Sequence, residues 1–214
     1  MIPLVKICGI TNPHDATAAV AAGASAIGIV FWPSSPRAVD AARAREIIAA
    51  IPAPVSVVGV FVNQVDEASR LAAELGLSAV QFHGDETAED CRRAGARVIR
   101  SVSVRDGSAV ETALALPESV TILLDAHDPV KRGGTGCVVD WSVAREIARR
   151  RFTILSGGLN PDNVTDAVAA VNPWAIDVSS GVEQSPGRKD PAKVLALFAA
   201  LDRRAGAMAA KGVE

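Results

Sequence analysis

The sequence has few cysteines, almost no net charge and no long apolar run, and each of these absences excludes a class of protein. Its three cysteines, Cys8, Cys91 and Cys137, are an odd number at unrelated spacings, which fits neither a disulfide framework nor a set of zinc ligands. The formal net charge of the 214 residues is -2, so charge gives no reason to expect nucleic acid or an anionic membrane as a partner. We therefore expect reduced thiols and a small ligand.

Targeting and membrane signals are also missing. No apolar run approaches the roughly 18 residues that cross a bilayer, and the stretch from Met1 to Lys6 has no basic region ahead of an apolar segment. These features predict a cytoplasmic protein. Apolar residues make up 49% of the chain, which is too much for a disordered protein and enough for one sizeable core. We expect a single domain.

Short apolar runs alternate along the chain with alanine-rich, charged segments of helical period. Strands are predicted at Leu4–Ile7, Ala26–Phe31, Val55–Val62, Ala79–Phe82, Val98–Val102, Val120–Leu124, Phe152–Leu155 and Ala175–Val178. Helices are predicted after Pro13 and at Asp40–Ala50, Val65–Leu75, Glu86–Ala94, Ser108–Leu116, Trp141–Arg150, Asn163–Val171 and Pro191–Leu201. Strands that are apolar over their whole length indicate a parallel sheet covered on both sides. Eight such units predict an α/β protein with a closed (β/α)8 TIM barrel.

The length leaves no room for a second domain, so the barrel is predicted over residues 1–204. A doubly wound open sheet is the alternative, although it usually needs fewer strands. No self-similarity of about 20 to 50 residues indicates a solenoid or a duplicated half-barrel. The small, polar segment Ala205–Glu214 is expected to fray.

Two strand ends carry candidate catalytic groups, because barrels of this kind place their active sites at the C-terminal ends of their strands. Asp125 follows an apolar strand, and burial there favours the neutral form that suits a general acid; a loop-anchoring aspartate is the alternative. Cys8 ends the first strand. A thiol must be partly ionised to act as a base, which nearby cations or helix ends can arrange, whereas an unreactive cysteine would be a small core residue. Lys6 lies on the same strand face one layer deeper, where a buried structural role is at least as reasonable.

The turns after the last two strands are typical of a phosphate site. Gly157 and Gly158 follow strand seven, and Ser180 and Gly181 follow strand eight, where a short helix is expected at Val182–Glu183. Glycine lets backbone N–H groups approach an anion closely, and a helix start adds positive potential. Barrels commonly hold a phosphate group between these two loops, so a small phosphorylated substrate is predicted; ordinary tight turns are the alternative.

Arg37 follows Ser34-Ser35-Pro36 in a stiff loop, where it is a candidate clamp for a substrate carboxylate. His14, His83 and His127 lack any metal-ligand spacing; His83 either lines the pocket or is a hydrogen-bonded structural residue. The segment Gly133–Gly136 is not a dinucleotide fingerprint, because Val139 stands where the third glycine belongs, and it is interpreted as a loop over the site. We expect no metal and no cofactor.

At these positions the sequence resembles the phosphoribosylanthranilate isomerase family of tryptophan biosynthesis. The resemblance is carried by Val5–Thr11, Gly28–Phe31 with Ser35–Arg37, Val60–Asn63, Val80–Gly84, Leu124–Asp125, Gly133–Gly136 with Asp140–Trp141, Ser156–Leu159 and Asp177–Glu183. It implies a (β/α)8 barrel that performs an Amadori rearrangement without cofactor or metal. It also implies that Cys8 is the general base, Asp125 the general acid, Arg37 the ligand of the anthranilate carboxylate and the glycine turns the ligands of the phosphate.

Other readings stay open at this point. The histidine-pathway aminoaldose isomerase runs the same chemistry, but its family resembles a duplicated half-barrel with an aspartate at the position of Cys8. A phosphosugar epimerase would need metal-ligand histidines, and a non-catalytic sugar-phosphate-binding barrel would not need Cys8 and Asp125 together. Whether the chain is a monomer or a homodimer is not indicated by the sequence.

Overall fold

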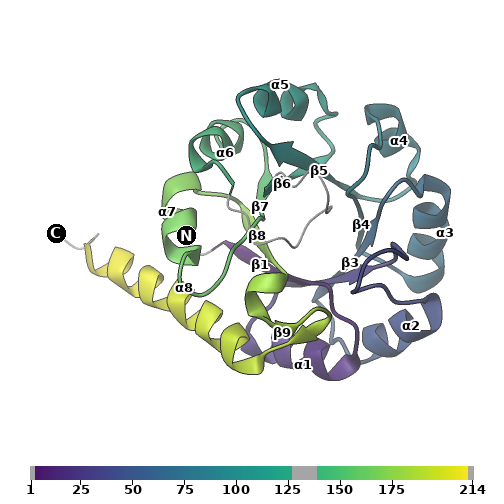
Figure 1. Ribbon diagram of the computed structural model, residues 1–214, viewed down its shortest axis with the longest axis horizontal. Helices are drawn as coiled ribbons and strands as arrows, with labels where there is room; N and C mark the ends of the chain where they lie inside the picture. Colours follow the sequence, from purple (N-terminus) through teal and green to yellow (C-terminus); the bar gives the residue numbers. More distant parts are fainter. Residues whose placement is uncertain (1–2, 127–138, 212–214) are drawn as a thin grey trace.

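The computed structural model describes residues 3–126 and 139–211, and eight parallel strands close into a barrel in the order β1 to β8. The strands are β1 Leu4–Cys8, β2 Ala26–Val30, β3 Ser56–Phe61, β4 Ala79–Phe82, β5 Val98–Val104, β6 Thr121–Ala126, β7 Thr153–Leu155 and β8 Ala175–Val178. The helices are α1 Pro13–Ala22, α2 Ala41–Ala49, α3 Val65–Leu75, α4 Ala88–Arg93, α5 Ser108–Ala115, α6 Trp141–Ala148, α7 Val164–Val171 and α8 Pro191–Lys211. They surround the strands as an outer ring (Figure 1). The predicted fold class is confirmed.

Short-range sequence signals fix where the helices begin and end. Asn12, Asp40 and Thr87 precede α1, α2 and α4, and each side chain accepts a hydrogen bond from a backbone N–H of the first turn. α1 and α3 end at Gly23 and Gly76, whose φ angles of 116° and 65° are costly for any residue with a side chain. The helices therefore stop where the next strand has to start.

Buried side chains line the inside of the barrel in layers. One small or branched residue from each of β3 to β8 forms an apolar layer near the start of the strands; these are Val58, Ala79, Ile99, Leu123, Ile154 and Ala175. Cys8, Val30 and Val60, with Trp32 against them, form a second cluster at the ends of the first three strands. The second cluster therefore marks the end of the barrel where the strands finish.

Gly28 makes room for the thiol at the end of β1. It is paired with Cys8 in the β1–β2 register, and a Cβ atom at this position would lie 2.7 Å from the Cys8 Sγ and 3.0 Å from the Lys6 Nζ. Real Cβ atoms essentially never come as close as 2.7 Å, so a side chain here would displace the Cys8 thiol and crowd Lys6. The glycine is a packing requirement of the site.

Two segments after β8 differ from the sequence prediction. The expected short helix at Val182–Glu183 is instead a single 3-10 turn, Ser180–Val182 (η1), and Glu183 already belongs to a small antiparallel hairpin, β9 Glu183–Ser185 and β10 Arg188–Lys189. Neither hairpin strand has an apolar run, so periodicity could not reveal it.

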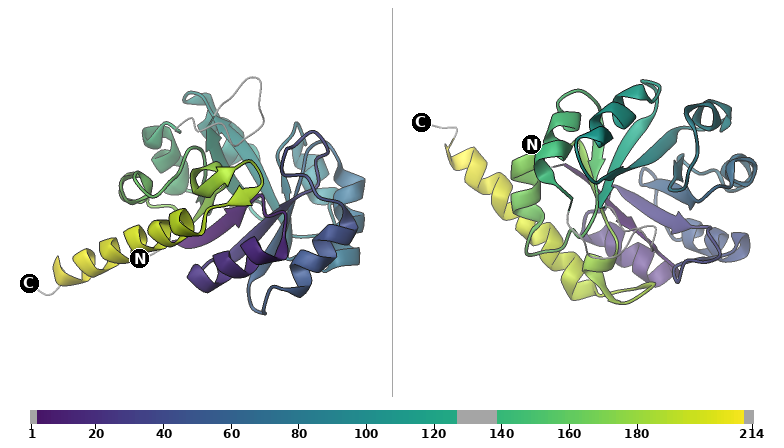
Figure 2. Two further views of the ribbon diagram at one scale, coloured as in Figure 1. Left: turned by 60° about the horizontal axis from the view of Figure 1, so that its bottom comes forward. Right: turned by 45° about the horizontal axis from the view of Figure 1, so that its top comes forward.

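At the C-terminal end, α8 is helical to Lys211, and Figure 2 shows it projecting past the barrel. Alanine is frequent in this stretch and has the highest helix propensity, which favours a helical backbone. Fraying of the segment from Ala205 stays a prediction.

Candidate active site

A cavity of about 380 Å³ opens at the C-terminal end of the barrel. Its lining residues are Cys8, Val30, Trp32, Ser34, Ser35, Pro36, Arg37, Val60, Val62, Gln81, His83, Asp125, Ser156, Asp177, Ser179 and Pro186. The structure thus brings Cys8, Arg37 and Asp125 together, as the sequence predicts, although they come from three different parts of the chain. His83 lines the same cavity.

The Cys8 thiol is nearly covered, at 7% exposure, and it lies beside two cations. Burial raises the pKa of this thiol and the nearby Asp177 carboxylate adds to the rise, while Lys6 and Lys189 oppose it. The sequence prediction that cations would promote ionisation is therefore only half right: the cations are present, but desolvation outweighs them. Cys8 is therefore mainly a thiol at neutral pH.

Lys6 is a buried structural partner, the alternative that the sequence left open. Its ammonium donates hydrogen bonds to Gln81 Oε1 and Asp177 Oδ1, each over 2.9 Å. Burial acts against the charge, but Asp177 and Cys8 more than offset this, and the pKa of Lys6 is raised. Lys6 therefore stays positive throughout the range in which Cys8 ionises.

Asp125 lies in β6 with its carboxylate buried at the mouth of the barrel. Its Oδ2 is 3.1 Å from His83 Nε2, and His83 Nδ1 is 3.3 Å from Gln81 Nε2. His83 therefore lines the pocket and is hydrogen-bonded at the same time. Among residues 3–126 and 139–211, His83 is the side chain hydrogen-bonded to this carboxyl group.

Arg37 does not stand free at the cavity. Its Nε and Nη2 donate to Glu183 Oε1 and Oε2 over 2.8 and 2.7 Å, a paired contact with both carboxylate oxygens. Lys189 Nζ donates to the same Glu183 Oε1 over 2.8 Å. Burial acts to raise the pKa of Glu183, but the two cations overcome this and hold it below its ordinary value. One edge of the guanidinium is thus fixed by Glu183.

The four predicted phosphate residues lie beside the cavity rather than in its lining, where their neighbours Ser156 and Ser179 stand. Gly157 and Gly158 adopt left-handed φ angles of 83° and 64°, so both need glycine. A Cβ atom on Gly181 would lie 1.9 Å from the Leu159 carbonyl oxygen, so the two turns are in close backbone contact. Whether these turns hold a phosphate stays a prediction.

Sequence reasoning missed four charged or polar residues, Gln81, Asp177, Glu183 and Lys189, as members of the site. One signal was available for Asp177: when the barrel closes, β1 pairs with β8 and sets Lys6 opposite Asp177. Glu183 and Lys189 come from the unpredicted hairpin. The predicted loop Gly133–Gly136, with His127 and Cys137, lies outside the described residues.

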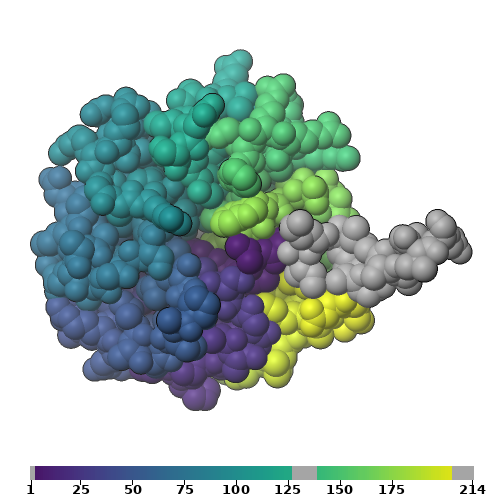
Figure 3. All heavy atoms as spheres, turned by 180° about the vertical axis from the view of Figure 1, so that it is seen from behind, coloured from purple at the N-terminus to yellow at the C-terminus, as the bar shows by residue number. Residues whose placement is uncertain are grey.

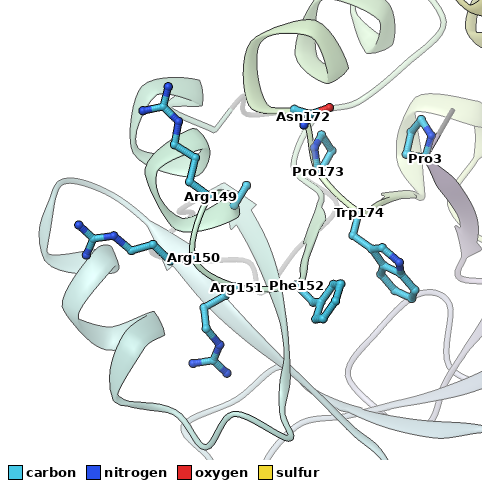
Figure 4. Close-up of a pocket in the computed structure, with 9 residues that line it drawn as sticks. Pro3, Arg149, Arg150, Arg151, Phe152, Asn172, Pro173 and Trp174 are labelled. Carbon is cyan, nitrogen blue, oxygen red and sulfur yellow. The ribbon is translucent and has the colours of Figure 1, made fainter. Parts of the chain in front are cut away.

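A second cavity, of about 430 Å³, lies at the opposite end of the barrel, the end seen in Figure 3. It contains Phe152 and Trp174, whose rings meet edge to face at 6.1 Å. Figure 4 shows the guanidinium groups of Arg149, Arg150 and Arg151 pointing away from these rings. Polar groups do not converge there, so this cavity is not the candidate site.

Within residues 3–126 and 139–211, none of the helices has the length and apolarity needed to cross a lipid bilayer. Over the same ranges, no three His, Cys, Asp or Glu side chains gather as a metal-binding group.

A closed parallel barrel whose strand ends carry a cavity lined by a thiol, a carboxyl group and an arginine has the architecture of a (β/α)8 enzyme. The family model described as N-(5'phosphoribosyl)anthranilate (PRA) isomerase matches residues 5–200, and the chain belongs to this family. It is an isomerase.

Individual relatives agree with this assignment. The chain is 46% identical over 200 residues to N-(5'-phosphoribosyl)anthranilate isomerase of Neisseria meningitidis serogroup C, covering 92% of this chain and 96% of the relative. It is 48% identical over 200 residues to the enzyme of the same name from Pseudomonas fluorescens, covering 92% and 95%.

Solved structures give the same result. The crystal structure of phosphoribosyl anthranilate isomerase from Thermotoga maritima matches with a TM-score of 0.87 at 41% identity, over 94% of this chain and 99% of that chain. A phosphoribosyl anthranilate isomerase in complex with reduced 1-(o-carboxyphenylamino)-1-deoxyribulose 5-phosphate matches with a TM-score of 0.84 at 40% identity, over 94% and 99%.

Proposed function

We propose that this isomerase converts N-(5'-phosphoribosyl)anthranilate to 1-(2-carboxyphenylamino)-1-deoxyribulose 5-phosphate in tryptophan biosynthesis, with Cys8 as general base and Asp125 as general acid. The observation that carries the assignment of roles is their shared cavity: Cys8 ends β1, Asp125 lies near the end of β6, and both line the same 380 Å³ space. Two groups on facing strands can reach the two ends of one sugar.

The first step opens the ribose ring. Asp125 gives its proton to the ring oxygen while the lone pair of the anilino nitrogen pushes the ring C–O bond open, which leaves a protonated Schiff base and a carboxylate. The positive nitrogen makes the neighbouring C2 hydrogen acidic. A positioned acid of this kind contributes about 10²–10⁴ to the rate.

The second step removes that hydrogen. The Cys8 thiolate takes the C2 proton, and the electrons of the C–H bond neutralise the Schiff base to give an enolamine. Transfer of a proton from the C2 hydroxyl to C1 then gives the ketone, without a covalent bond to the enzyme. Lys6, held beside the sulfur, stabilises the thiolate that this step needs.

Substrate anchors hold the sugar between the two groups. The free edge of Arg37 is directed to the anthranilate carboxylate, and the turns Gly157–Gly158 and Ser180–Gly181 to the 5'-phosphate. Fixed anchors at both ends of the substrate supply positioning energy. The related structure with a bound phosphorylated product analogue supports a small phosphorylated ligand here.

The free thiols of Cys8 and Cys91 support a reducing compartment such as the cytoplasm. The Thermotoga maritima relative is described as dimeric, and monomers of it have also been crystallised.

The test is turnover by the pure protein. Loss of the fluorescence of the anthranilate adduct should follow addition of enzyme, while the aminoaldose of the histidine pathway should not react at a comparable rate. Comparable turnover of both substrates would contradict the assignment of a single substrate. If the protein does not turn over the anthranilate adduct, the proposed activity is wrong and a non-catalytic sugar-phosphate-binding barrel is the alternative.

A further inference from the structure

Hydrogen-bonded side chains form a continuous line across the barrel from Lys6 to Asp125. Lys6 Nζ is 2.9 Å from Gln81 Oε1, Gln81 Nε2 is 3.3 Å from His83 Nδ1, and His83 Nε2 is 3.1 Å from Asp125 Oδ2. Gln81 is 1% exposed, so no solvent competes for its amide. These hydrogen bonds connect Lys6, which lies beside the proposed base Cys8, to the proposed acid Asp125.

Lys6 fixes the orientation of the Gln81 amide and so the donor and acceptor in each of these hydrogen bonds. An ammonium group has only donors, so the glutamine atom it contacts is the carbonyl oxygen, and the NH2 group faces His83. That NH2 donates to His83 Nδ1, which must therefore offer a lone pair. The neutral imidazole then carries its hydrogen on Nε2 and donates it to Asp125 Oδ2.

From this line we infer that Gln81 is a positioning residue: it keeps His83 in the neutral Nε2–H form and thereby assigns the reactive proton of Asp125 to Oδ1. Because Oδ2 accepts the proton of His83, the carboxylic hydrogen has only Oδ1 to occupy. A hydrogen on Nδ1 would face the NH2 group of Gln81, donor against donor. This matters because an imidazolium ion would hold Asp125 as a carboxylate, which cannot act as an acid.

The charges around His83 come from several elements. They are Asp125 on β6, Lys6 and Cys8 on β1, Asp177 on β8 and Arg37 in the loop after β2, with Glu86 and Arg100 on the side of β4 and β5. Glu86 and Arg100 are occupied by backbone groups, since Glu86 accepts from the Gly84 N–H and Arg100 donates to the Gly84 carbonyl. Within the part of the chain that the structure describes, Asp125 and Gln81 are the two side chains hydrogen-bonded to the His83 ring.

The replacement Gln81→Glu separates this role from a structural one. Glutamate keeps the shape and the acceptor for Lys6, so a residue that only held Lys6 would survive the change. It replaces the NH2 donor by an oxygen, which favours a proton on His83 Nδ1. We expect kcat to fall about 10²-fold with KM changed less than about threefold, because the acid is lost and the anchors are not.

Two further variants make the test specific. Gln184→Glu is the matched control, since it makes the same chemical change at an exposed position of β9. Gln81→Glu should cause no additional loss once His83→Ala has been made, because the effect passes through His83. Additive losses would overturn the inference, and so would normal kcat in Gln81→Glu.

Nitrogen-15 NMR of the His83 ring, recorded without substrate, tests the same inference independently of turnover. At pH 7 the protein should show hydrogen on Nε2 alone, and Gln81→Glu should show hydrogen on both nitrogens. A His83 ring protonated at Nδ1 in the unaltered protein would contradict the inference. The inference rests on the proposed role of Asp125, and the two fail differently: an active Asp125→Asn enzyme would remove the acid while leaving the NMR result in place.

Discussion

At the residue scale, the location of the two proposed catalytic side chains, Cys8 and Asp125, follows from their positions in the sequence. A thiol or a carboxyl group at a strand end is placed by the chain itself, so Cys8 and Asp125 could be predicted from the sequence, and both line the cavity. The ionisation of Cys8 could not be predicted, because it depends on burial and on Asp177, which is 169 positions away along the chain and adjacent only once the barrel closes.

The raised pKa of Cys8 predicts how activity depends on pH. The base must be a thiolate, and its pKa lies above the ordinary thiol value, so kcat/KM should rise with pH through the alkaline range. Lys6 keeps its charge over this range because its pKa is also raised. Replacing Cys8 by aspartate should move the rise to acidic pH. Identical, flat profiles from pH 7 to 10 for both enzymes would exclude Cys8 as the titrating base.

At the scale of elements, the small hairpin β9–β10 contributes two charged residues, Glu183 and Lys189, next to the cavity formed by the barrel strands. Glu183 accepts hydrogen bonds from Arg37, and Lys189 donates to the same Glu183 carboxylate. The backbone N–H of Lys189 also donates to Asp15 Oδ2 at the start of α1 over 2.8 Å. Sequence reasoning found Arg37 but not Glu183, because two strands of two and three residues leave no periodic pattern.

The replacement Glu183→Gln tests the hairpin's role in substrate binding. Glutamine replaces one of the two acceptor oxygens of Glu183 by an NH2 donor, so the paired contact with Arg37 Nε and Nη2 is broken, and Lys189 loses its counter-charge. Hydrogen bonds to charged groups are worth about 1.5–3 kcal/mol, so KM should rise about 10-fold or more while kcat changes much less. Michaelis kinetics against Arg37→Ala would check this, and a loss confined to kcat would contradict the assignment.

At the scale of the whole molecule, the closure of the barrel is the step that builds the site. β1 and β8 lie at opposite ends of the sequence, and their pairing sets Lys6 against Asp177 inside the barrel. The number and order of strands could be predicted because each is a local apolar run. The buried contacts of Lys6 with Gln81 and Asp177 could not be predicted, because these residues come from β1, β4 and β8 and become neighbours only in the closed sheet.

Removing one partner of this closing pair should destabilise the fold. Lys6→Met leaves the buried Asp177 without its counter-charge, and breaking a buried pair in this way costs about 3–5 kcal/mol. Urea unfolding measures the loss. Glu46→Gln is the control, because it removes one side of the exposed pair with Arg43, where about 0–1 kcal/mol is expected. Equal losses in the two variants would mean that the Lys6 pair does not hold the barrel closed.

The central claim is that a thiol and a carboxyl group act from two sides of one cavity. Turnover of Cys8→Ala and Asp125→Asn, each with its substrate affinity, tests it most directly. Both variants should lose about 10²-fold or more in kcat while binding the substrate nearly normally, since Arg37 and the glycine turns are untouched. Near-normal turnover in Cys8→Ala would contradict the account.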